Sequence, residues 1–154
     1  MHADQPAESD GTAVTVALEV LPRIVRLLTL ASANPGPGPE PLTLTQFRLL
    51  KHLGEGPLMT TVLAARLEVT PATVSAAIDG LVRRGMVERL PSTGDRRAVP
   101  LRCTPDGHAA LEAARARQHA ALSRLFSALS PQETRELADG LRAVRRVLAE
   151  RHGH

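Results

Sequence analysis

The amino-acid sequence predicts a mostly helical fold that carries one small β-hairpin. Three observations lead to this class. Residues 60–83 have the spacing of two helices joined by a short turn, residues 86–102 place two strand-like runs around a basic turn, and the long flanking segments repeat apolar residues every three or four positions. A chain of 154 residues suits one domain with a modest core, or one subunit of an intertwined oligomer.

The two central helices are predicted from their start and stop signals. Thr70 can cap a helix whose first residue is Pro71, and Gly85 can end that helix in a left-handed conformation. A shorter helix over 60–67 precedes it, and the turn 68–70 joins the two, as in a helix-turn-helix whose second helix can enter a major groove. The second helix has an apolar inner face, Val74, Ile78, Leu81 and Val82, and a small, hydroxylated outer face, Ala72, Thr73, Ser75, Ala76 and Asp79.

A hairpin with a basic tip follows the second helix directly. The runs 86–90 and 99–102 are strand-like, and the turn 91–98 between them carries Arg96 and Arg97. A helix-turn-helix followed by such a hairpin is a winged helix. We therefore predict an all-α winged helix-turn-helix with a small β-hairpin wing.

The order of these motifs resembles the MarR family of bacterial transcription regulators. The resemblance rests on Gly-Met-Val-Glu-Arg at 85–89, Asp-Arg-Arg at 95–97, Thr-Pro-Asp-Gly at 104–107 and the helix-like run 42–50, and it extends over nearly the whole chain from about residue 12. The chain departs from the family where a hydroxyl residue often caps the third helix, because Met59 stands there; we expect Thr60 to cap instead. Many members also have arginine near position 76, where this chain has alanine.

The segments outside the winged helix are predicted from proline and capping signals. Residues 1–11 are expected to be a disordered tail, and residues 12–33 a helix that Pro22 should kink or divide. The Pro/Gly run 34–41 cannot be helical. Thr43 with Gln46, and Ser130 with Glu133, are capping boxes that start helices. We assign 43–103 to the winged helix-turn-helix, and 12–33 and 104–151, with helices at 104–129 and 131–151, to dimerisation.

The composition narrows the classes of function. The sequence has two phenylalanines and no tyrosine or tryptophan, so it lacks the aromatic side chains on which single-strand binders stack bases. Binding to duplex DNA is still compatible with this composition. The net charge of +3 is small, although residues 66–102 carry seven arginines against four acids. The polar start is no signal peptide, and no apolar run approaches the roughly 20 residues of a membrane span, so we expect a cytoplasmic protein without a membrane partner.

Duplex DNA is the partner that the motifs predict. Hydroxyl and methyl groups of the second helix can contact base edges, and its first residues can approach the backbone. Arg83 is a candidate phosphate contact, although a charge favourable to the helix dipole explains it equally well. The resemblance implies that Asp95 aims Arg97 into a minor groove; a solvated turn is the plain alternative. The DNA-binding residues that we predict are Pro71, Ala72, Thr73, Ser75, Ala76, Arg83, Asp95, Arg96 and Arg97.

The resemblance also implies a homodimer on palindromic DNA, with its recognition helices one DNA turn apart, and release by a small-molecule effector that the sequence does not identify. We predict no enzyme, metal site or cofactor, because no catalytic motif stands out and the histidines have no ligand spacing. Two alternatives stay open at this point. One is a winged-helix protein-interaction module without DNA binding, and the other is a regulator that senses oxidants through Cys103.

Overall fold

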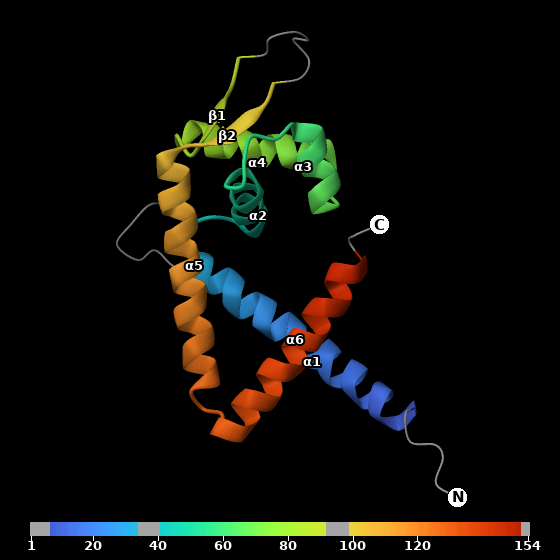
Figure 1. Cartoon of the computed structure of the whole chain (residues 1–154). Helices are drawn as coiled ribbons and strands as arrows, with labels where there is room; N and C mark the ends of the chain where they lie inside the picture. Colours follow the sequence, from blue (N-terminus) through green and yellow to red (C-terminus); the bar gives the residue numbers. More distant parts are fainter. Residues whose placement is uncertain (1–6, 34–40, 92–98, 152–154) are drawn as a thin grey trace, which may run out of the picture. The chain divides into compact units, whose positions relative to one another are not determined.

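The computed structural model describes residues 7–33, 41–91 and 99–151. In these ranges the order of elements is α1 (Ala7–Ala33), α2 (Leu44–Leu53), α3 (Thr60–Leu67), α4 (Pro71–Arg83), β1 (Val87–Arg89), β2 (Leu101–Cys103), α5 (Pro105–Phe126) and α6 (Pro131–Arg151). Figure 1 shows α2, α3 and α4 gathered beside the hairpin. The mostly helical class with a two-stranded wing is therefore confirmed, and two compact units divide the chain between Gln118 and His119.

The predicted helix ends are confirmed where a side chain or a glycine determines them. Thr43 and Gln46 form the capping box of α2, and Ser130 and Glu133 form that of α6. The hydrogen bonds from Ser130 lower the pKa of Glu133. At the end of α4 Gly85 has φ 68°, and the amides of Gly85 and Met86 donate to the carbonyls of Val82 and Leu81, which is the Schellman pattern.

Three expectations about helix boundaries were wrong. The first helix begins at Ala7 rather than Thr12, so the predicted tail over 1–11 is wrong for residues 7–11; residues 1–6 lie outside the described ranges. Of the two effects expected of Pro22, the division of the helix is contradicted, because α1 continues through this residue, whereas the kink stays a prediction. Met59, not Thr60, is the cap residue of α3, without a side-chain hydrogen bond.

The wing strands are shorter than predicted and gain a third partner. Val87 pairs with Cys103, Glu88 with Arg102 and Arg89 with Leu101, in antiparallel register. Leu101 also exchanges two backbone hydrogen bonds with Leu58, of 3.1 and 2.9 Å. The segment before α3 is thereby fixed to the hairpin, which fixes the helix-turn-helix relative to the wing.

Aliphatic side chains of the helix-turn-helix and the hairpin share one core. All inner-face residues predicted for α4 face this core, with Val82 only partly buried. The absence of tyrosine and tryptophan from the sequence suits this core, because leucine, valine and alanine fill the space between closely packed helices. The largest fully buried side chains are Leu49, Leu50, Leu53, Leu63, Val74, Ile78, Leu81 and Leu101.

A glycine permits the start of α5 to lie directly against the hairpin. A Cβ atom at Gly107 would come within 2.1 Å of the Met86 carbonyl oxygen and 2.7 Å of Cys103 Sγ. The Met86 carbonyl is backbone and is held by a hydrogen bond from the Thr104 amide. It therefore cannot move aside as the end of a flexible side chain could. In α6, by contrast, a Cβ atom at Gly140 would meet nothing within 4 Å among the described residues.

We predict opposite effects of the same substitution at these two glycines. Gly107→Ala should lower the free energy of unfolding by about 3 kcal/mol, because the added methyl forces the helix away from β1. Gly140→Ala should raise it by up to about 1 kcal/mol, because alanine has the higher helix propensity. Urea denaturation followed by circular dichroism measures both values. Equal effects of the two substitutions would contradict the close contact at Gly107.

Candidate nucleic-acid interface

The outer face of α4, defined by Ala72, Thr73, Ser75, Ala76 and Asp79, is exposed along its whole length. Pro71 and Arg83, before and after it, are exposed as well. Because these side chains are short, another surface can approach the helix backbone closely. The face is therefore small and weakly charged, as the sequence predicts. Its contact with DNA stays a prediction.

The start of α4 is capped by a pair of hydroxyl groups. Thr70 Oγ1 accepts a hydrogen bond of 3.2 Å from the Thr73 amide, and the two threonine hydroxyls lie 2.9 Å apart. The Thr73 hydroxyl thus already has a partner, which orients it before any ligand arrives. Pro71 occupies the first helical position and contributes no amide, so the first backbone N–H group of the helix is that of Ala72.

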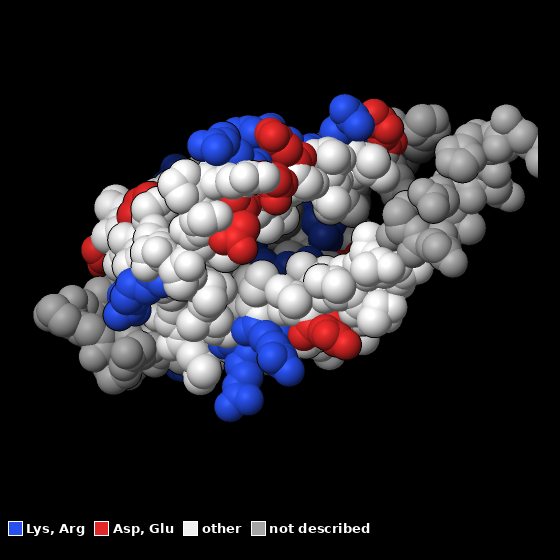
Figure 2. Space-filling model, turned by 90° about the horizontal axis from the view of Figure 1, so that it is seen from below, with Lys and Arg blue, Asp and Glu red and all other residues white. Residues whose placement is uncertain are grey.

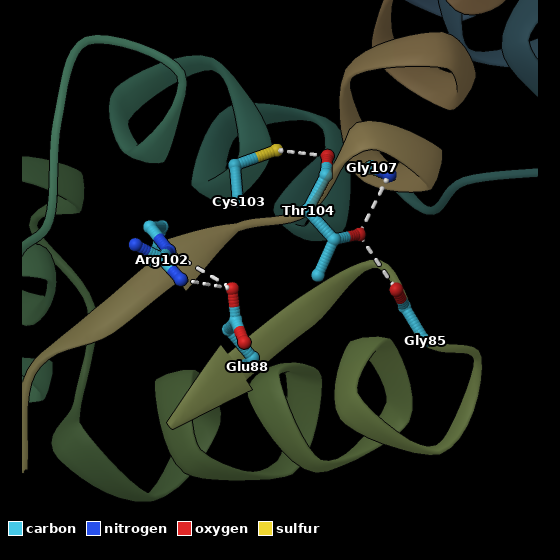
Figure 3. Close-up of polar contacts among 6 residues, drawn as sticks. All are labelled: Gly85, Glu88, Arg102, Cys103, Thr104 and Gly107. Atoms are coloured by element: carbon cyan, nitrogen blue, oxygen red, sulfur yellow. Dashed lines mark hydrogen bonds and ion pairs between the residues drawn. The ribbon is translucent and has the colours of Figure 1, made fainter. Parts of the chain in front are cut away.

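Two arginine–carboxylate pairs fix side chains on the hairpin. Glu88 and Arg102 face each other across the two strands, with 2.9 Å between Glu88 Oε1 and both Arg102 Nε and Nη2 (Figure 3). Arg89 reaches instead from β1 to α4, where its Nη2 donates to Asp79 Oδ1 at 2.7 Å. All four side chains are about half exposed, so these pairs organise the surface and add little to stability.

Sequence reasoning missed the pair between Asp79 and Arg89. Asp79 was placed on the outer face, but no sequence pattern connects it with a strand residue ten positions later. Arg84 is a different case, because its Nη1 donates to the Pro41 carbonyl and to Gln46 Oε1, each at 3.3 Å. Arg84 thus ties the end of α4 to the start of α2, while Arg83 beside it points to solvent.

The predicted wing-tip residues Asp95, Arg96 and Arg97 lie outside the described residues. The structure does place the base of the wing, because the Leu90 amide donates to the Pro100 carbonyl at 2.8 Å beyond the last strand pair. Their roles in DNA binding therefore remain predictions from the sequence.

The junction of the wing with α5 is organised by Thr104. Its Oγ1 donates to the Gly85 carbonyl at 2.6 Å and accepts from the Gly107 amide at 3.1 Å (Figure 3). The Thr104 amide donates to the Met86 carbonyl at 3.1 Å. One residue therefore connects the end of α4, the start of β1 and the first turn of α5.

Cys103 is buried at this same junction. Its Sγ lies 3.6 Å from the Thr104 carbonyl oxygen, and burial raises the pKa of the thiol. A reactive cysteine needs the opposite, an accessible sulfur with a lowered pKa. Cys103 thus has the environment of a small packing residue at the end of a strand.

The histidines of the described segments form no metal site: no group of three or more His, Cys, Asp or Glu there could hold a metal ion. His52 borders a cavity of about 310 Å³ together with Glu55, Leu58 and Arg66. Burial lowers the pKa of His52, and its buried Nδ1 has no hydrogen-bond partner among the residues that the structure describes. Within the described ranges, no helix is long and apolar enough to cross a membrane.

The helix-turn-helix, its exposed second helix and the adjoining hairpin define a winged helix-turn-helix protein. Residues 40–98 match the model of the MarR family. The chain is therefore similar to this family over its helix-turn-helix and the first strand of the hairpin.

Curated relatives and solved structures are also similar to this chain. The chain is 44% identical over 55 residues to the HTH-type transcriptional repressor YetL of Bacillus subtilis, and 32% identical over 83 residues to the HTH-type transcriptional repressor MdtR of the same organism. These matches cover 36% and 54% of this chain, and 33% and 54% of the two relatives. The fold is similar to that of YusO from B. subtilis, with a TM-score of 0.71, 24% identity, and coverage of 92% of this chain and 99% of that one.

We predict that the Cys103 thiol reacts slowly in the folded protein. Its alkylation by iodoacetamide should be at least about a hundredfold slower than in the urea-unfolded chain, because the sulfur must first become accessible by local opening. Mass spectrometry of timed samples gives both rates. Similar rates in the two states would contradict the burial of Cys103 and restore the redox-sensing alternative.

Proposed function

We propose that this protein is a transcriptional regulator that binds duplex DNA as a homodimer, and that it acts as a repressor. The observation that carries the proposal is the exposed outer face of α4, made of small and hydroxylated residues and placed beside the hairpin by the fold. The match of residues 40–98 to the MarR family model supports it, as do the two relatives that are named transcriptional repressors. A regulator of this kind works where the bacterial chromosome lies, in the cytoplasm.

In this proposal the first two turns of α4 enter the major groove. Thr73 and Ser75 supply hydroxyl groups for bases or phosphates, and Ala76 supplies a methyl group that can pack on thymine. With alanine at position 76, no arginine stands there to read guanine through two hydrogen bonds. The wing would add Arg96 and Arg97 to a minor groove, with Asp95 aiming Arg97, and Pro71, Ala72 and Arg83 would contact the backbone.

The homodimer is supported by apolar side chains that the single chain leaves exposed. In α1 they recur at Val14, Leu18, Leu21 and Val25, and the first of these is 60% exposed. In α6 they recur at Leu141, Val144 and Leu148. Figure 2 shows a face of the molecule on which uncharged surface prevails between separate groups of charged side chains. Monomers rarely expose such periodic stripes, whereas paired helices of two subunits bury them.

A dimer would read DNA with two recognition helices. Its two-fold axis requires a palindromic site whose halves lie one DNA turn apart, roughly 34–36 Å. We also propose that a small molecule regulates binding, as the family resemblance implies. Such an effector can act only if it binds the DNA-competent and DNA-incompetent dimers with different affinity.

We predict that binding to DNA weakens steeply with salt and depends on Arg97. Fluorescence anisotropy of a labelled duplex, selected by the protein from a random pool, should show an affinity that falls as salt is raised, because bound counterions are released. Arg97→Ala should weaken binding by about tenfold without lowering the midpoint of urea denaturation. If the pool yields no bound duplex at low salt, the chain is not a DNA-binding regulator, and the protein-interaction alternative stands.

We predict that the chain is a dimer in solution and that charges in the apolar stripes separate it. Light scattering after size-exclusion chromatography should give twice the mass of one chain, because the exposed stripes of α1 and α6 are buried between subunits. Leu21→Glu and Val144→Glu should each shift the protein toward the monomer. Arg142→Glu, which introduces the same glutamate side chain at an exposed position of α6 outside the apolar stripe, is the control. A monomeric wild-type protein would contradict the dimer.

A further inference from the structure

The outer face of α4 carries one acidic side chain where DNA would favour none. Asp79 lies one turn after Ser75 and Ala76, and its side chain is 53% exposed. A carboxylate that faces the phosphates of DNA raises the electrostatic free energy of the complex. If α4 enters the groove as proposed, Asp79 needs a compensating role.

Arg89 of β1 supplies the compensating charge. In the register of the hairpin Arg89 stands opposite Leu101, and Val87, two residues earlier, is buried. The alternation of side chains along a strand therefore sends Arg89 to the face of the hairpin that packs on α4. There its Nη2 lies 2.7 Å from Asp79 Oδ1. The pair is locally neutral, and because the Arg89 side chain is 49% exposed, other N–H groups of its guanidinium can reach a ligand.

Stability does not account for this pair. Both side chains are half exposed, and exposed ion pairs contribute little to folding. The end of α4 and the hairpin are already joined by the buried residues Ile78, Leu81 and Met86, and by the backbone hydrogen bonds at Gly85. What the pair does fix is the direction of one long side chain at the corner between helix and wing.

We propose that Asp79 is a positioning residue that holds the Arg89 guanidinium at this corner for contact with a DNA phosphate. The inference rests on the proposed function and deepens it, because it assigns a phosphate contact to a residue outside the predicted set. Arg89 serves here because its fork of N–H groups can bond a carboxylate and a phosphate at once. The order that Asp79 imposes on Arg89 before binding reduces the entropy lost when the complex forms.

The direction in which one substitution changes the affinity for DNA tests the proposal. Asp79→Asn removes a negative charge from the DNA-facing surface, so electrostatics alone predicts equal or tighter binding. If Asp79 positions Arg89, affinity falls instead, by about three- to tenfold at 0.1 M salt. Arg89→Ala should weaken binding by about tenfold and reduce the slope of log affinity against log salt by about 1. In the double variant the two losses should not add, because Asp79 acts through Arg89.

A neighbouring pair provides the matched control. Glu88 is adjacent to Arg89 and pairs with Arg102 across the strands (Figure 3), on the opposite face of the hairpin from Arg89. Glu88→Gln removes the same charge from the same strand, and we expect its affinity for DNA to equal or slightly exceed that of the wild type. Urea denaturation of each variant identifies any loss of binding that is caused by unfolding.

The measurements use the full-length protein and the duplex that the wild type selects, so the two proposals fail in different ways. If the wild type binds no duplex, the proposed function fails. If the wild type binds and folded Asp79→Asn binds equally well or more tightly, the positioning role is wrong and the proposed function stands. Weaker binding by Asp79→Asn, an unchanged Glu88→Gln and a smaller salt slope for Arg89→Ala together support it.

Discussion

A threonine hydroxyl at the base of the wing holds together the elements on which the rest of the winged helix depends. Thr104 bonds the carbonyl that follows α4 and caps the first turn of α5, while its amide bonds the start of the hairpin. The close approach is available only because Gly107 has no side chain. With these contacts in place, the bridge between Leu58 and Leu101 connects the helix-turn-helix to the same sheet. The outer face of α4 therefore has a defined direction relative to the wing.

Because this geometry is fixed, a surface of modest charge can still bind its ligand specifically. The outer face of α4 has few groups of its own that could bind strongly, since its side chains are short. Specific contact then depends on where the surrounding side chains are held, and the pair between Asp79 and Arg89 holds one of them at the corner with the hairpin. Affinity would come from arginines around the helix, and sequence preference from the hydroxyl and methyl groups on it.

Much of the fold could be predicted from the sequence because its boundaries are local. Thr43, Thr70, Ser130 and Gly85 each stop or start a helix through hydrogen bonds within a few residues, and all four predictions are confirmed. The errors arose where the surroundings of a residue in the fold, rather than its neighbours in the sequence, determine the local structure. Pro22 is tolerated inside α1 because that part of the helix is exposed, and Met59 takes the cap position without a capping side chain.

For the same reason, only the part of the site that lies on a single helix could be predicted. Periodicity identified the outer face of α4, because exposure along one helix follows its 3.6-residue repeat. The contact between Asp79 and Arg89 depends instead on how β1 packs against α4, and that packing is set by the buried residues of several elements. No pairwise signal in a single sequence encodes it.

The junction at Thr104 also leaves the wing without a hinge at its base. The hairpin is bonded on one side to the end of α4 and on the other to the first turn of α5. A rotation of that turn would carry the hairpin with it as one rigid piece.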